Sequence, residues 1–409
     1  MTTLASLLDY ASLVPSPSAS PSQPPSQSTS PGSPLWAVLL VGLGGALFGG
    51  AGAFAGAWRS SRALRQNTEN TLEHERTRLL NERFNTAAEL LGHREAACRL
   101  AGVHAMAGLA DDWAERRQTC LDVLCAYLRM PYSPPPEDDA PAEQHLDWQA
   151  NREIRHTVIR VIRDHQQPRS ATSWDGHDYD FTGTVFDGGD FSRTRFTGNV
   201  SFNGAEFAGG TVSFDNAEFT GGTVTFDNAK FTGGTVTFDN AEFTGGTVTF
   251  HRAEFTGGTV TFFRSKLADG TMLFDFAKFT GSLVLFDSAE LAGGMMRFRG
   301  TKFTGGIVNF GGTKFTGGIV KFRGTEFTGG MVTFGDAKFA GGLVDFKSAK
   351  FAGSLVTFHR AEFTGGTVKL RLVMSWAVPP VFDNEAFLHP PAGLQLPEHP
   401  GSAGGPAAS

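Results

Sequence analysis

Phenylalanine recurs with a fixed period through the second half of the chain. One series of bulky residues, each twelve apart, runs Phe207, Phe219, Phe231, Phe243, Phe255, Leu267, Phe279, Leu291, Phe303, Phe315, Phe327, Phe339, Phe351 and Phe363. A second series of the same period consists of Phe alone and runs from Phe202 to Phe358. The repeating unit is close to FTGGTVTFDNAE, which contains two five-residue steps and a dipeptide. Such a period predicts a solenoid of stacked coils.

Strand alternation decides which side chains of a unit point inward. In the segment 223–226, Val224 and Phe226 are expected inside and the two threonines outside. Gly221 and Gly222 suit a corner that needs a positive φ or a close approach of backbones. Twelve residues are too few to enclose two Phe and a Val, so about 24 residues is the smallest coil that stacks like residues on one another. About eight such coils are expected.

One outward position changes character along the repeat. The residue before the inward Val is Thr in the first half, and in the second half it is large and apolar: Leu283, Met295, Ile307, Ile319, Met331, Leu343 and Leu355. With a 24-residue coil, Leu283, Ile307, Met331 and Leu355 fall on one face and Met295, Ile319 and Leu343 on another. Exposed apolar rows usually mark a contact site, which Arg297, Lys321 and Asp345 would rim. The alternative is that this position tucks into the corner and belongs to the core.

The segments around the repeat are predicted from their own patterns. Residues 59–130 have apolar positions at helical spacing, divided into three helices at Gly92 and at Asp111-Asp112. Residues 131–150 are interpreted as a linker rich in proline and acidic residues, and 151–168 as an amphipathic helix that covers the first coil. The solenoid is expected at 173–388, closed at its far end by Leu370 to Phe387 with Trp376. Residues 389–409 are expected to form a disordered tail.

Residues 35–58 form an uncharged stretch long enough for a helix to cross a bilayer. Trp36 and Trp58 stand at its two ends, where interfacial indoles are common. Arginines follow at once, whereas the Pro- and Ser-rich arm at 1–34 has no Lys or Arg. The positive-inside rule therefore predicts a single-pass protein of the cell membrane, with the disordered arm outside and the repeat in the cytoplasm.

Two other interpretations of this stretch are a cleaved signal peptide and a buried core helix. Ala53-Phe54-Ala55 has the form of a cleavage site, but the leader before it is long and uncharged. A core helix fits poorly with polar flanks and a basic stop. Within the stretch, Gly45 and Gly49, and then Gly52 and Gly56, are four apart, a spacing that would let two spans pack closely as a homodimer.

The charge content narrows the class of partner, and the cysteine content narrows the cellular compartment. The net charge of -6 argues against direct nucleic-acid binding. Residues 187–262 carry nine acidic and four basic side chains, and residues 263–370 carry eight and fourteen, so the repeat is bipolar. The three cysteines, Cys98, Cys120 and Cys125, show no paired spacing, which favours a reducing compartment.

No catalytic, cofactor or metal site is predicted, and the chain is not expected to be an enzyme. The Gly-Gly pairs recur every twelve residues without a following Lys-Ser/Thr, so they are interpreted as corners and not as phosphate loops. The cysteines, together with His93 and His104, lack the spacing of a zinc site. No Ser, Cys or His stands beside a base in an identifiable motif.

The repeat resembles the pentapeptide-repeat family, whose unit has a bulky central Leu or Phe and a small residue two positions earlier. Ala217 before Phe219, and Ala229 before Phe231, match that pattern. The block from Arg83 to Arg129 is similar to the helical segment of bacterial membrane-anchored pentapeptide-repeat proteins. The resemblance implies a right-handed quadrilateral β-helix, but the extra dipeptide departs from a strict five-residue unit.

The function predicted from these features is a membrane-tethered scaffold that presents a rigid solenoid to an unknown protein partner. One alternative, implied by the resemblance, is DNA mimicry toward topoisomerases, which needs a denser acidic face than this bipolar repeat has. Another is surface or ice binding by a Thr-x-Thr ladder, if the repeat is extracellular. That ladder consists of Thr223/Thr225, Thr235/Thr237, Thr247/Thr249 and Thr259/Thr261.

Overall fold

The computed structural model of the protein describes residues 65–66, 68–383 and 389–397. The arm, the predicted span at 35–58 and its four glycines lie outside these residues. The chain divides into two compact units, residues 1–75 and residues 76–409, and the second contains the helices and the repeat that follow. Among the described helices, none combines the length and the apolar character needed to cross a membrane.

The helical region of the second unit precedes the repeat. Its elements after residue 91 are α2 (Ala96–Asp112), the 3-10 helix η1 (Ala114–Arg116), α3 (Arg117–Arg129) and α4 (Ala142–Gln166). The buried sides of α2 and α3 meet through apolar residues such as Met106, Leu109 and Leu121. The boundary predicted for α4 at residue 151 is wrong by nine positions. Residues 142–150 are mostly good helix formers, and Glu143 places a negative charge in the first turn, so the helix begins directly after Pro141.

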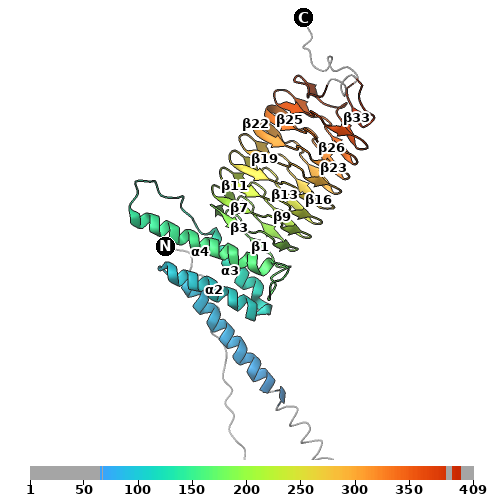
Figure 1. Cartoon of the computed structure of the whole chain (residues 1–409). Helices are drawn as coiled ribbons and strands as arrows, with labels where there is room; N and C mark the ends of the chain where they lie inside the picture. The colour runs from blue at the N-terminus through green and yellow to red at the C-terminus, as the bar shows by residue number, and fades with distance from the viewer. Residues whose placement is uncertain (1–64, 67, 384–388, 398–409) are drawn as a thin grey trace, which may run out of the picture. The chain divides into compact units, whose positions relative to one another are not determined.

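The repeat folds as a parallel β-solenoid of about nine coils with about 24 residues per coil (Figure 1). Lys230 pairs with Glu254, and the same shift of 24 continues along the stack. The coil size predicted from the period is therefore confirmed. The first coil is shorter, because Tyr179 pairs with Val200, 21 residues later. The twelve-residue period does not include this coil, and for that reason about eight coils was too few.

Each coil has four sides, here called faces A, B, C and D in chain order. Face A contains β1 (Tyr179–Asp180), β5 (Val200–Ser201), β9 (Thr223–Thr225), β13 (Thr247–Thr249), β17 (Thr271–Leu273), β21 (Met295–Arg297), β24 (Ile319–Lys321), β27 (Leu343–Asp345), β31 (Thr367–Lys369) and β33 (Leu394–Gln395). Face D contains β4 (Arg195–Phe196), β8 (Glu218–Phe219), β12 (Glu242–Phe243), β16 (Lys266–Leu267), β20 (Glu290–Leu291), β23 (Lys314–Phe315), β26 (Lys338–Phe339) and β30 (Glu362–Phe363).

Faces B and C belong to one sheet, because two long strands, β22 (Lys302–Asn309) and β25 (Glu326–Thr333), run through both. The other strands of face B are β2 (Val185–Phe186), β6 (Glu206–Phe207), β10 (Lys230–Phe231), β14 (Glu254–Phe255), β18 (Lys278–Phe279), β28 (Lys350–Phe351) and β32 (Ser375–Trp376). Those of face C are β3 (Gly189–Asp190), β7 (Thr211–Ser213), β11 (Thr235–Thr237), β15 (Thr259–Thr261), β19 (Leu283–Leu285) and β29 (Leu355–Thr357).

The interior consists of stacked phenylalanine rings. Phe250 is fully buried, and its ring centroid lies 4.8 Å from that of Phe226 and 4.6 Å from that of Phe274, with the ring planes nearly parallel. Val224 is also buried, whereas Thr223 beside it is exposed. The predicted inward and outward positions are therefore confirmed. The rings form columns along the rod, one coil apart, and bury large apolar areas without any polar atom.

The Gly-Gly corners are confirmed by their backbone geometry. Gly222 has a φ of +61°, and a Cβ on it would lie 2.1 Å from the carbonyl oxygen of Gly198 on the previous coil. Only glycine fits such a position. The corner that follows faces A and C instead uses a residue such as Asn228 in the left-handed region, at a φ of 56°. Asn tolerates that region better than most residues do.

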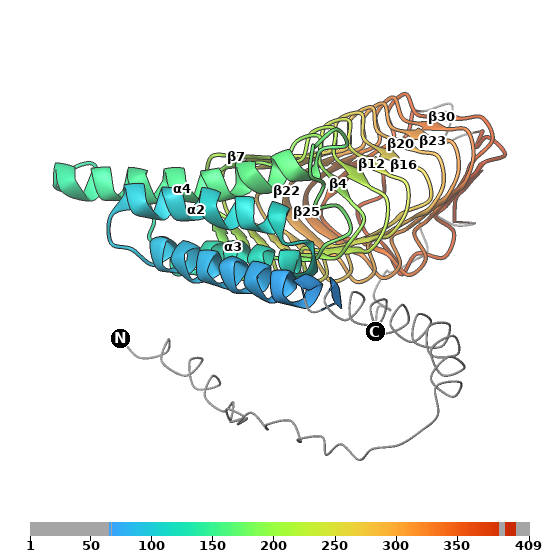
Figure 2. The same ribbon diagram turned by 90° about the horizontal axis from the view of Figure 1, so that it is seen from below.

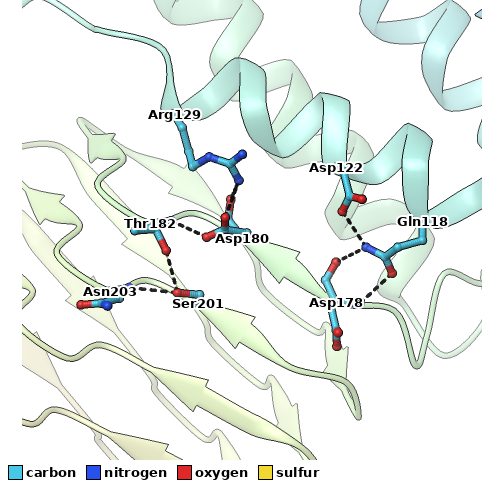
Figure 3. A network of polar contacts seen from close by, with 8 residues as sticks. All are labelled: Gln118, Asp122, Arg129, Asp178, Asp180, Thr182, Ser201 and Asn203. Atoms are coloured by element: carbon cyan, nitrogen blue, oxygen red, sulfur yellow. Dashed lines mark hydrogen bonds and ion pairs between the residues drawn. The ribbon is translucent and has the colours of Figure 1, made fainter. Parts of the chain in front are cut away.

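The helices α3 and α4 lie across the first coil (Figure 2). The side-chain amide of Gln118 on α3 donates to the carbonyl oxygen of Asp178 at 2.8 Å and accepts from its N–H at 3.1 Å (Figure 3). Arg129 donates to both the carbonyl oxygen and the carboxylate of Asp180, each at 2.7 Å. These polar side chains occupy hydrogen-bonding groups of the first strand that would otherwise template another strand.

Asp187, between faces B and C of the first coil, joins the coil to α4 and to the segment before it. Its carboxylate accepts hydrogen bonds from the Tyr132 hydroxyl at 2.7 Å and from Arg152 Nε at 3.0 Å, and it lies 3.0 Å from His156 Nε2. Burial alone would raise the pKa of Asp187, but the hydrogen bonds from His156 and Tyr132 and the charge of Arg152 lower it overall. The carboxylate is therefore held in its ionised form.

The far end of the solenoid is closed by the segment after β31. Trp376 packs edge-on against Phe351, and Phe382 stacks on Phe358 with the ring centroids 4.7 Å apart. The closure continues further than predicted, because Leu394 of β33 pairs with Val368 of β31. The expectation of a disordered tail from residue 389 is therefore wrong for residues 389–397. The Pro- and Gly-rich composition of this segment did not predict an ordered structure. The burial of the Leu394 side chain accounts for its order.

Candidate protein-interaction surface

The seven apolar residues predicted as a contact site lie on two faces of the solenoid. On face C, Leu283 pairs with Ile307, Ile307 with Met331, and Met331 with Leu355. On face A, Met295 pairs with Ile319, and Ile319 with Leu343. The structure therefore brings each set together as a row along the rod, with one residue per coil.

The two rows differ in exposure. On face C, 41% of Ile307, 36% of Met331 and 44% of Leu355 is exposed, while Leu283 is half-buried. All three members of the face A row are half-buried. The valines that follow Ile307 and Met331 are the residues that point into the core. Neither row is thus part of the phenylalanine core, and face C offers the more accessible apolar surface.

Two members of the face C row, Ile307 and Met331, lie on strands that continue through the corner between faces B and C, where Gly306 and Gly330 keep positive φ values of 72° and 73°. β22 and β25 each continue from face B into face C, with a shift in register around Thr304. Ser354 lies beside this corner on the next coil, fully buried, and its hydroxyl donates to the carbonyl oxygen of Gly329 at 2.6 Å. Ile307 and Met331 are consequently held on backbone that is hydrogen-bonded on both sides.

Four exposed apolar residues in the closing segment were missed by the sequence analysis: Leu372, Met374, Val378 and Val381. Val381 bridges to Thr357 of face C, so the apolar surface continues past Leu355. These residues follow the last full repeat, where the twelve-residue period no longer assigns inward and outward positions. An apolar run that continues after the period has ended was the available signal.

The Thr-x-Thr pairs of the first half do not form a single ladder. The pairs at 223/225 and 247/249 lie on face A, and those at 235/237 and 259/261 lie on face C. Some of their hydroxyls are engaged within the solenoid, since Thr261 Oγ1 donates to Asp239 at 2.8 Å. The flat, continuous threonine surface that ordered water would require is therefore divided between two sides.

Faces B and D carry ladders of opposite charges in place of apolar rows. Lys278 lies 2.8 Å from Glu254, and Lys350 lies 2.9 Å from Glu326, both on face B. On face D, Lys338 lies 3.1 Å from Glu362. These ion pairs satisfy part of the charge on both faces internally. Like charges also meet one coil apart, as with Lys278 and Lys302 on face B. The apolar side chains of the rows on faces A and C cannot form such ion pairs with one another.

The described residues offer no evident chemistry for catalysis or metal binding. Cys120 and Cys125 are buried in the helical core, and burial raises the pKa of these thiols to about 11 and about 12. Within the part of the chain that the structure describes, no group of three or more His, Cys, Asp or Glu side chains is placed to hold a metal ion.

Comparison with known proteins gives one match. The family described as pentapeptide repeats (9 copies) matches residues 181–224. This stretch contains the first coil, where Phe181, Phe186, Phe191 and Phe196 are five apart. No curated protein and no solved structure matches the chain.

Proposed function

We propose that this chain, which its family match supports as a pentapeptide-repeat protein, is a membrane-tethered, non-catalytic scaffold that binds a protein partner through its apolar rows. The observation that carries the proposal is the face C row, in which Ile307, Met331 and Leu355 are exposed on three successive coils. Large apolar side chains gathered in this way commonly mark a protein contact.

The rigidity of the surface supports binding. The stacked rings beneath it are closely packed, and the strands that carry the row are paired with neighbours on both sides. A surface that is already ordered loses little conformational freedom when a partner binds. The contact area also extends beyond the row, because the exposed Val381 bridges to Thr357 of face C.

The membrane tether is proposed from the uncharged stretch at 35–58 and the arginines that follow it. With this tether, the proposed location of the solenoid is the cytoplasm. The spacing of Gly45, Gly49, Gly52 and Gly56 would allow two spans to pair, so that each assembly presents two solenoids.

Site-specific crosslinking tests the proposal. A photoreactive amino acid replaces Ile307 in the full chain in its native membranes, and Thr235, which lies on the same face three coils earlier, serves as the matched control. A discrete protein adduct from position 307 and none from position 235 is the expected result. Equal adducts from both positions, or none from either, would contradict a contact at the apolar row.

A further inference from the structure

Four exposed cations are stacked at the edge between faces A and B. Arg299, Arg323, Lys347 and Arg371 follow one another at intervals of 24 residues, so each lies one coil from the next. Within the described residues, none of the four has an ion-pair partner. On face B, by contrast, Lys278 pairs with Glu254 on the previous coil. The position one coil before Arg299 is Asp275, whose carboxylate already pairs with Arg297, so the four cations are left without an ion-pair partner among the described residues.

The surroundings of the column are also basic. From Arg297 to Arg371, the outward positions of this edge carry nine basic side chains: Arg297, Arg299, Lys302, Lys321, Arg323, Lys347, Lys350, Lys369 and Arg371. Glu326 and Asp345 oppose them, and Asp275, one coil before Arg299, pairs with Arg297 at 2.6 Å. Glu326 lies near both Lys302 and Lys350. The opposite edge, between faces C and D, is nearly balanced over the same coils, because Arg360 pairs with Asp336 and Lys338 with Glu362. The excess positive charge of the second half is thus concentrated on one edge.

A row of small residues, with a large apolar residue at each end, runs beside the cation column. The neighbouring corner positions on successive coils are Phe276, Gly300, Gly324, Ser348 and Leu372. The two ends are large and exposed, with 45% of Phe276 and 60% of Leu372 accessible, while the three central residues are small. A Cβ on Gly324 would meet no atom within 4 Å, whereas a Cβ on Gly300 would lie 2.8 Å from the ring of Phe276, which packs over that position. The four coil steps from Phe276 to Leu372 span about 19 Å, the length of about six extended residues.

We infer that this edge docks a short acidic segment of a partner protein, lying along the cation column and the row of small residues beside it. Its carboxylates would pair with Arg299, Arg323 and Lys347, and its apolar ends would contact Phe276 and Leu372. Arginine suits carboxylates because its planar guanidinium makes two parallel hydrogen bonds. The inference rests on the proposed role as an interaction scaffold, and it adds the chemistry of the partner at a second surface.

The geometry favours a polypeptide over other anions. The cations extend from face A around the corner to face B, so a flat bilayer surface would reach only the corner column, whereas an unfolded acidic segment can follow the corner. A long nucleic acid would continue past Phe276, where acidic residues such as Glu254 and Asp227 alternate with basic ones such as Arg252, and would find no excess of positive charge there.

A binding titration tests the inference. The full chain in detergent is titrated into a fluorescein-labelled peptide of six glutamates flanked by leucines, and fluorescence anisotropy is measured at low and high salt. Changing Arg299, Arg323, Lys347 and Arg371 together to Gln is expected to weaken binding by about tenfold or more. The matched control changes Lys266, Lys314, Lys338 and Arg360 to Gln, which removes the same charge from other parts of the surface and should alter the affinity by less than about twofold.

Several outcomes would overturn the inference. Equal losses in both quadruple variants would show a response to net charge alone, and unchanged binding in the first variant would place the contact elsewhere. Tighter, column-dependent binding of single-stranded DNA or of phosphatidylserine vesicles would assign the edge to another class of partner. The four substitutions remove repulsion between like charges, so they should not lower the melting temperature of the protein. If the quadruple variant nevertheless unfolds, the binding titration is carried out with the double variant Arg323→Gln/Lys347→Gln. Loss of peptide binding with the crosslink at position 307 retained would leave the proposed function standing.

Discussion

Gln118 meets the main chain of Asp178 with both a donor and an acceptor, at 2.8 and 3.1 Å, as a neighbouring strand would. The helical region thereby occupies the exposed edge of the first coil with side chains instead of backbone. Unpaired strand edges are sites of self-association, so this contact protects the chain as well as stabilising it.

Removing that contact should loosen the first coil. Gln118→Ala leaves the N–H and the carbonyl oxygen of Asp178 without their partner, and the expected loss of stability is about 1 to 3 kcal/mol. Thermal unfolding followed by circular dichroism measures the loss, and light scattering measures the expected rise in self-association. The exposed Gln144 of α4 provides a control whose change to Ala should have little effect.

The phenylalanine columns predict a strong response to truncation. Phe250→Ala would remove a ring that stacks between Phe226 and Phe274, and the cavity should cost about 3 to 5 kcal/mol. Limited proteolysis and thermal unfolding report the change. The outward substitution Thr247→Ala on face A is the control. Equal stability of the two variants would contradict the inward assignment of this column.

The lowered pKa of Asp187 predicts a dependence on pH. An acid whose pKa is lower in the folded state than in the unfolded chain stabilises the fold above its unfolded pKa, about 3.9, and this contribution is lost as the pH falls through the folded value. Asp187→Asn should therefore lower the melting temperature at pH 7. The difference from the wild type should shrink below about pH 4. A constant difference across the acid range would show that ionisation of Asp187 is not involved.

The face C row predicts a separation of folding from binding. Changing Ile307 and Met331 together to Thr restores at both positions the residue found in the first half, and the fold should remain intact because neither side chain is in the core. Partner capture or self-association should be abolished, as measured by crosslinking from Leu355 or by sedimentation. The matched control changes Thr235 and Thr259 together to Ser. Unfolding of the Ile307/Met331 variant would contradict the outward assignment.

The proposed topology predicts opposite labelling at the two ends of the chain. A cysteine in place of Ser20 should react with a membrane-impermeant maleimide in intact cells. A cysteine in place of the exposed Leu372 should react only after the cells are opened. The unaltered chain, which has Cys98, Cys120 and Cys125, gives the background labelling. The reverse pattern would place the repeat outside the cell.

Features that depend on the twelve-residue period could be predicted from the sequence, and features that depend on the two ends of the repeat could not. The 24-residue coil, the inward Phe250 and the corner at Gly222 follow from packing rules that apply equally to every unit. The short first coil and the pairing of Leu394 were missed, because each is fixed by contacts with a neighbour and not by the repeated pattern. The apolar rows could be assigned to faces in advance, but their exposure depends on how far each corner turns. The cation column was visible only as an excess of charge until the coils placed its members next to one another.

Two faces related by half a coil make the solenoid tolerant of one change in length and sensitive to another. A gain or loss of 24 residues lengthens or shortens the rod while every later residue keeps its face. A gain or loss of twelve leaves an equally well packed core, because Val236 of face C and Val248 of face A occupy equivalent inward positions. It would, however, turn every later side chain to the opposite side. Ile307 and Met331 would then move to face A, and the column of Arg299 and Arg323 would move from the edge between A and B to the edge between C and D. A single insertion or deletion of twelve residues would thus move the binding surfaces to the opposite side of the rod, with no substitution and no loss of the fold.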